Sequence, residues 1–191
     1  MFKFMKTSAM TAVMIAGGCA IVALSAFAQA HEHGVAEVGV AVDGKSVQIE
    51  FTAPGSAIMG FEHEPKTAAD KKKIADAFAK FRSNVASMFV FDQTLGCKLN
   101  TVSIELGEDD HDHGDGHANG HSHDADHDHG HSEVRALVDA SCSRPVEGST
   151  LRFQVSRYFP EASTLRVQVV GNSFQTGAEL KGARNSIKLS R

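Results

Sequence analysis

Histidine and aspartate are concentrated in one segment of this 191-residue chain, residues 107–132. Residues 105–133 hold ten Asp and Glu residues and no Lys or Arg, and 107–132 has no Val, Ile, Leu, Met or aromatic residue. Imidazole and carboxylate are ligands for Zn²⁺, and also for Cu²⁺ and Ni²⁺. The segment is therefore predicted to bind metal through eight histidines: His111, His113, His117, His121, His123, His127, His129 and His131.

The composition of residues 107–132 also predicts a flexible loop. The segment cannot bury enough apolar surface to offset the entropy of ordering it. With two to four histidines for each metal, it would hold roughly two to four ions. The alternative is a solvated polar linker, but ordinary linkers are rich in Gly, Ser, Pro, Glu and Lys rather than His.

The other three histidines lie in sequence that is expected to fold. His31 and His33 stand close together, and His63 lies between Glu62 and Glu64, ahead of a predicted helix. If this loop folds back near residue 31, the three imidazoles would form one metal site. Glu62, another acid or water would then be the fourth ligand.

The first thirty residues have the pattern of a cleaved secretory signal. Lys3 and Lys6 precede an apolar run from Ala9 to Phe27, and Ala28-Gln29-Ala30 has the small-x-small form of a cleavage site. We expect a periplasmic protein of residues 31–191, a single domain without membrane insertion after cleavage. A retained transmembrane anchor is the alternative, because the run approaches a bilayer-spanning length.

Cleavage would leave two cysteines, Cys97 and Cys142, in an oxidising compartment. They are predicted to form a disulfide that staples the base of the 107–132 insertion. The alternative is that both serve as metal thiolates.

The periodicity of the remaining sequence predicts an α+β fold: a mainly antiparallel sheet with one packed helix. Alternating valines around Asp43-Gly44 predict a hairpin. Thr67 to Asp70 form a capping box before a stripe of Ile74, Phe78, Phe81 and Val85. Further strands are predicted over residues 99–106, 134–140, 151–157, 165–170, 174–180 and 186–189.

Several classes of function do not fit these patterns. A net charge of −4 argues against a nucleic-acid binder. The chain lacks HExxH and GxSxG. His121-x-His123 with Asp126-His127 is one residue too long for the zinc motif of metallo-β-lactamase-like hydrolases. We therefore expect a binding protein rather than an enzyme.

Four features together resemble the ZrgA family of bacterial periplasmic zinc-uptake proteins. They are His31-Glu-His-Gly34, the strand before Asp43-Gly44, the segment Gly60-Phe61-Glu62-His63-x-Pro65, and the His/Asp tract. The resemblance implies an accessory protein of a zinc ABC importer that binds Zn²⁺ and passes it on. It carries the metal-binding role to His31, His33, His63 and the histidines of 107–132.

Two other functions remain open from the residues alone. One is a copper or nickel buffer, because the ligand types do not separate these metals from zinc. The other is a metal- or pH-responsive interaction module whose His/Asp tract contacts a partner protein.

Overall fold

The predicted hairpin is the centre of the structure. The computed structural model describes residues 34–108, 132–182 and 184–190. In it, β1 (Val35–Asp43) and β2 (Ser46–Pro54) pair antiparallel. Gly44 in the turn has a φ of +57°, the left-handed conformation that two-residue hairpin turns require. Both strands of the predicted hairpin are confirmed, and its two-residue turn lies at Gly44-Lys45, one residue later than the predicted Asp43-Gly44.

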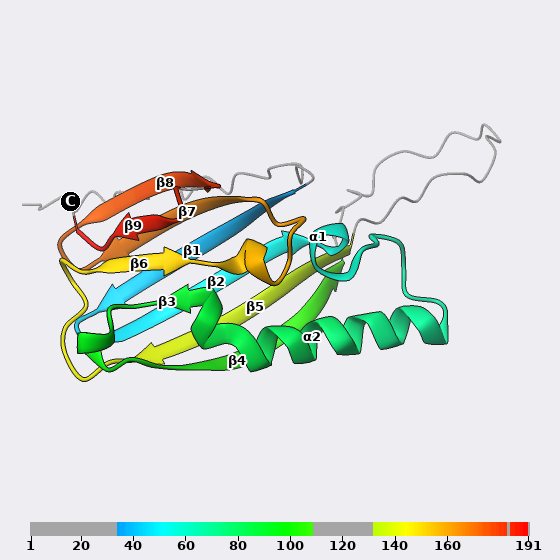
Figure 1. Cartoon of the computed structure of the whole chain (residues 1–191), viewed down its shortest axis with the longest axis horizontal. Coiled ribbons are helices and arrows are strands. Elements are labelled where there is room, and N and C mark those ends of the chain that lie inside the picture. The colour runs from blue at the N-terminus through cyan, green and yellow to red at the C-terminus, as the bar shows by residue number, and fades with distance from the viewer. Residues whose placement is uncertain (1–33, 109–131, 183, 191) are drawn as a thin grey trace, which may run out of the picture. The chain divides into compact units, whose positions relative to one another are not determined.

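The hairpin belongs to a six-stranded sheet with the order β4-β5-β2-β1-β7-β8 (Figure 1). Its neighbours are paired antiparallel, except that β1 and β7 run parallel, which agrees with the mainly antiparallel sheet that the sequence predicts. After β5 the chain crosses one face of the sheet and returns beside β1 in the same direction. The strands added here are β4 (Lys98–Glu108), β5 (Ser132–Ser141), β7 (Thr164–Gly171) and β8 (Gln175–Lys181).

A second, three-stranded sheet lies on that face, which the sequence did not predict. Its order is β3-β6-β9, and in Figure 1 it lies in front of the large sheet together with helix α2. The strand predicted over 151–157 is shorter, because a 3₁₀ helix, Val155–Arg157, follows its end. The strands are β3 (Phe89–Val90), β6 (Thr150–Phe153) and β9 (Ser186–Lys188).

The long helix begins where the capping box predicted. In α2 (Ala68–Met88), the Thr67 side chain accepts from the Asp70 backbone N–H, and the Asp70 carboxylate accepts from the Thr67 backbone N–H. A short helix that was not predicted, α1 (Gly55–Met59), directly follows β2. No helix among the described residues has the length and apolar character needed to cross a membrane.

Phenylalanines form the core between the layers. Phe51 of β2 packs against Phe81 of α2, with ring centroids 5.6 Å apart, and against Phe89 of β3 at 6.4 Å. Phe89 meets Phe153 of β6 edge to face at 6.0 Å. The three innermost rings, Phe51, Phe81 and Phe89, are completely buried. Each ring contributes a large apolar area and a favourable edge geometry, so this cluster joins helix and both sheets.

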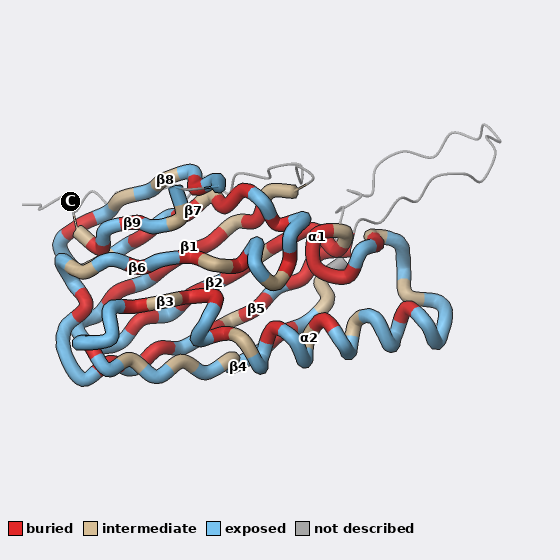
Figure 2. Tube along the Cα trace, viewed as in Figure 1, coloured by how far each residue is buried: buried red, intermediate tan, exposed pale blue. Residues whose placement is uncertain are grey.

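The opposite face of the large sheet is polar. Burial alternates along the strands, so that every second residue of β1 and β2 is buried (Figure 2). On the outer face Arg166 lies 3.5 Å from the Glu37 carboxylate and 3.8 Å from that of Glu179. This alternation is typical of an antiparallel sheet with one face on the core and one in water.

The predicted disulfide forms between Cys97 and Cys142, and its position corrects one expectation. Lys98 pairs with Ser141 at the disulfide end of the β4–β5 hairpin, and Glu108 pairs with Ser132 at the other end. Residues 109–131 connect Glu108 to Ser132 in the sequence. The bond therefore closes the end of the hairpin opposite the insertion rather than its base. Because the two sulfur atoms are bonded to each other, Cys97 and Cys142 do not serve as metal thiolates, the alternative that the sequence left open.

Replacing both cysteines by alanine should lower the free energy of unfolding by roughly 4 kcal/mol, because the bond closes a long loop in the unfolded chain. The folded circular dichroism spectrum should persist, since β4 and β5 remain paired along their length. Urea titration measures the change. Cys97 or Cys142 reacting with a thiol reagent in the unreduced, denatured protein would contradict the bond.

Candidate functional site

Strand register places the described residues that adjoin three histidine-bearing parts of the sequence at one end of the large sheet. Gly107 pairs with Glu133, and Glu133 pairs with Pro54. Val35 pairs with Thr164 on the other side of the hairpin. Neighbouring strands are about 4.8 Å apart, so β5 and β1 lie about 10 Å apart across β2. The chain therefore leaves β4, enters β5, leaves β2 and enters β1 at the same end.

The loop after α1 is attached to this end by hydrogen bonds from β5. The backbone N–H and the Oγ of Ser132 both donate to the Glu62 carbonyl oxygen at 3.0 Å. The Ser56 hydroxyl of α1 donates to the Glu62 carboxylate. Gly55 is needed for this approach, since a Cβ there would lie 2.7 Å from the Phe61 carbonyl oxygen and from Ser132 Oγ. The loop is thus joined to Ser132, the last residue of the histidine-rich segment 107–132.

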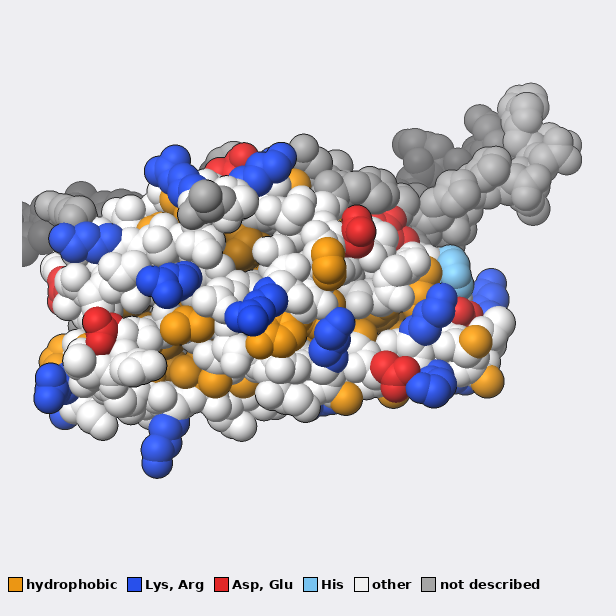
Figure 3. Space-filling view, in the orientation of Figure 1, with side chains coloured by type: hydrophobic (Ala, Val, Ile, Leu, Met, Phe, Trp, Pro, Cys, Tyr) orange, Lys and Arg blue, Asp and Glu red, His pale blue; other side chains and the backbone are white. Residues whose placement is uncertain are grey.

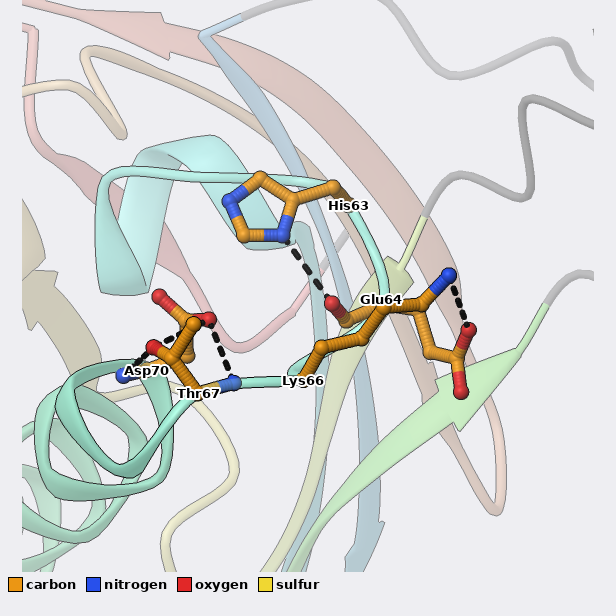
Figure 4. A network of polar contacts seen from close by, with 5 residues as sticks. All are labelled: His63, Glu64, Lys66, Thr67 and Asp70. Carbon is orange, nitrogen blue, oxygen red and sulfur yellow. Dashed lines mark hydrogen bonds and ion pairs between the residues drawn. The ribbon is translucent and has the colours of Figure 1, made fainter.

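His63 is exposed on this loop and held in one orientation (Figure 4). Its Nδ1 lies 3.0 Å from the Glu64 carbonyl oxygen, and its ring stacks on Phe61 with centroids 4.7 Å apart. A carbonyl oxygen only accepts, so Nδ1 carries the proton, and in the neutral imidazole the Nε2 lone pair is free for a metal. Histidine ligands in proteins are commonly oriented by such a bond from the second ring nitrogen.

Asp70 lies close to His63 and is bound by the helix cap. Hydrogen bonds from the Thr67 side chain at 2.7 Å and from its backbone N–H at 3.1 Å lower the pKa of Asp70 below its ordinary value of 3.8. Burial opposes this shift, and the charges of His63 and Lys73 add to it. The Asp70 carboxylate is therefore hydrogen-bonded within the helix cap (Figure 4).

The predicted ligands are only partly among the described residues. His63 and Glu62 are described. His31, His33, His111, His113, His117, His121, His123, His127, His129 and His131 lie outside the described residues. Over 34–108, 132–182 and 184–190, no three or more His, Cys, Asp or Glu side chains are grouped as a metal site would require. The proposed trio of His31, His33 and His63 stays a prediction.

The sequence did not predict the residues that hold the His63 loop. Ser132 and Glu62 are 70 positions apart, and neither belongs to a recognisable motif. Glu133 is buried beside them and pairs with Arg135. A local signal was present only for the stacked ring, since Phe61 and His63 are two positions apart, the spacing that places side chains on one side of a strand.

Comparison with known protein families gives a match over most of the chain. The family model described as ZrgA family zinc uptake protein matches residues 30–189. The chain belongs to the ZrgA family. No individual curated protein matches it. Membership assigns a role in zinc uptake, and the family match includes the His63 loop and the whole histidine-rich segment.

Asp70 should make the stability of this ZrgA family protein depend on acid. Because its pKa is lowered in the folded state, the unfolded chain binds more protons near the ordinary value of 3.8. Its stabilising contribution is present above that value and lost as pH falls through the lower, folded value. Asp70→Asn should therefore be less stable at pH 7 and lose less stability on acidification, as measured by urea midpoints.

Asp76→Asn is the matched control, because Asp76 is an exposed carboxylate on the same helix, paired with Lys72. If Asp70→Asn and the unmodified protein lose stability in parallel as the pH falls, the assigned role of Asp70 is wrong.

Proposed function

We propose that the protein is a periplasmic Zn²⁺-binding protein of a zinc acquisition system, which captures Zn²⁺ and passes it to an ABC importer. The carrying observation is that the strands adjoining residues 31–33, loop 60–67 and segment 109–131 begin or end at one end of the sheet. The family match supports zinc as the cargo. The signal-like residues 1–30 and the disulfide support the compartment.

Two kinds of binding follow from this arrangement. His63 is held with Nε2 directed away from its backbone partner, so coordination there costs little reordering. The histidines of 107–132 supply many imidazoles and carboxylates on one long connection. We propose that His63, with His31 and His33, forms the tighter site and that the segment collects ions beside it. Binding and release, without catalysis, account for the chemistry of these residues.

Deleting residues 109–131 and joining Glu108 to Ser132 through a two-residue Asn-Gly turn should lower the zinc stoichiometry by roughly two to four ions for each protein. Isothermal calorimetry measures the number. The tightest site should remain, because the deletion does not touch His63 or the residues that orient it. Unchanged stoichiometry would show that the segment does not store zinc. Titration with Cu²⁺ and Ni²⁺ in parallel tests the rival metals.

His63→Ala should weaken zinc binding at the tightest site by about tenfold or more. Removing a group from the coordination environment of a metal commonly lowers metal affinity by at least that factor. Glu64→Gln is the control, since its backbone carbonyl still orients an imidazole while its carboxylate, paired with Lys66 at 3.1 Å, is removed. A competing zinc chelator measures both affinities. Equal affinity of the His63→Ala protein and the unmodified protein would remove His63 from the site.

A further inference from the structure

Five cations project from α2, and most have no carboxylate partner. Lys72 pairs with Asp76 at 2.6 Å, and Asp70 is engaged by the helix cap. The other four, Lys71, Lys73, Lys80 and Arg82, are exposed and make no ion pair with any described residue. The helix face therefore carries a net positive charge that the fold does not neutralise.

Four of the cations stand in two rows on either side of the exposed crest of α2. At 3.6 residues per turn, Lys73 and Lys80 share one side of α2, and Lys71 and Arg82 share the other. The crest between these rows carries the Lys72–Asp76 ion pair together with Ala75 and Ala79. The pair is neutral overall, so the two rows of cations set the charge that this face presents to a partner.

Three of these cations are held in place by aromatic rings. Lys73 Nζ lies 5.6 Å from the centroid of Phe61, and Lys80 Nζ lies 5.1 Å from that of Phe159. The Arg82 guanidinium lies 5.9 Å from the centroid of Phe78. Such contacts favour one placement of a long side chain and lower the entropy lost when it meets a partner.

The charge is unevenly distributed over the folded part. Outside residues 1–30 and 105–133 the chain has 17 basic and 13 acidic residues, a net charge of +4. On the outer face of the large sheet, Arg166 is matched by Glu37 and Glu179. On the face that carries α2, Lys and Arg side chains predominate over Asp and Glu (Figure 3). The unneutralised positive charge is therefore on the α2 side.

This basic surface begins at the metal-binding loop. Phe61 contacts His63 by stacking and Lys73 by the cation contact, so one ring joins the two. We propose that the exposed face of α2 docks a protein surface rich in Asp and Glu and places it beside His63. A zinc-accepting protein presents carboxylates, imidazoles or thiolates, and a surface rich in carboxylates is repelled by residues 105–133, which carry a net charge of −10. The α2 cations supply the opposing attraction.

The test compares two variants with the same change in net charge. Lys71→Glu/Lys73→Glu/Lys80→Glu reverses three charges on α2. Arg144→Glu/Arg152→Glu/Lys188→Glu reverses three exposed charges that are not on the helix, two of them on strands β6 and β9 of the small sheet, so the comparison separates α2 from its neighbours on the same face. Fluorescence anisotropy follows binding of a labelled oligoglutamate peptide to each zinc-free protein at low salt. The α2 variant should bind about tenfold more weakly than the unmodified protein, and the control variant less than about twofold.

Equal weakening in both variants, or no binding by the unmodified protein, would overturn the docking surface. Vesicles of phosphatidylglycerol and phosphatidylcholine are tested in parallel. Loss of vesicle binding with unchanged peptide binding in the α2 variant would assign the face to an anionic membrane and also overturn the proposal. The link to zinc transfer rests on the proposed function, but docking is measured without zinc. Failure of zinc binding and failure of docking are therefore separate results.

Discussion

The packing of Phe81 against Phe51 and Phe89 is the interaction on which the rest of the structure depends. These rings come from α2, β2 and β3, so one buried cluster sets the distance between helix, large sheet and small sheet. With α2 held there, its first turn and the Thr67–Asp70 cap have a defined position. The loop that carries His63 runs from α1 to that cap, so its two ends are set by the core.

Among the described residues, His63 is the histidine that the fold orients. No group of three or more metal-ligating side chains lies in that part of the chain, and the other histidines are outside it. If the proposed zinc site is completed by ligands from outside the described residues, the entropy of ordering those ligands lowers its affinity relative to a preformed site. A lower affinity would favour the release of zinc that the proposed function requires.

The elements that depend on local signals could be predicted from the sequence. The elements that depend on long-range contacts could not. Asp43-Gly44 and the Thr67–Asp70 box are local signals, so the hairpin and the cap were recognisable, although the turn itself lies one residue later, at Gly44-Lys45. The parallel pairing of Val38 with Val167 depends on where a crossing chain re-enters a sheet, which no short pattern encodes. His63 was recognisable from its residue type. Its orientation by a backbone carbonyl and the Ser132–Glu62 contact arise only in the folded chain.

The pairing of Glu108 with Ser132 separates the length of the histidine-rich segment from the fold. Both ends of that segment are fixed by the sheet, and the disulfide closes the hairpin at its other end. Doubling the length of a flexible connection costs only about 0.6 kcal/mol in closure entropy. Insertions and deletions of histidine and aspartate can therefore accumulate there at little cost to folding. The number of histidines between Glu108 and Ser132 can therefore change independently of the domain.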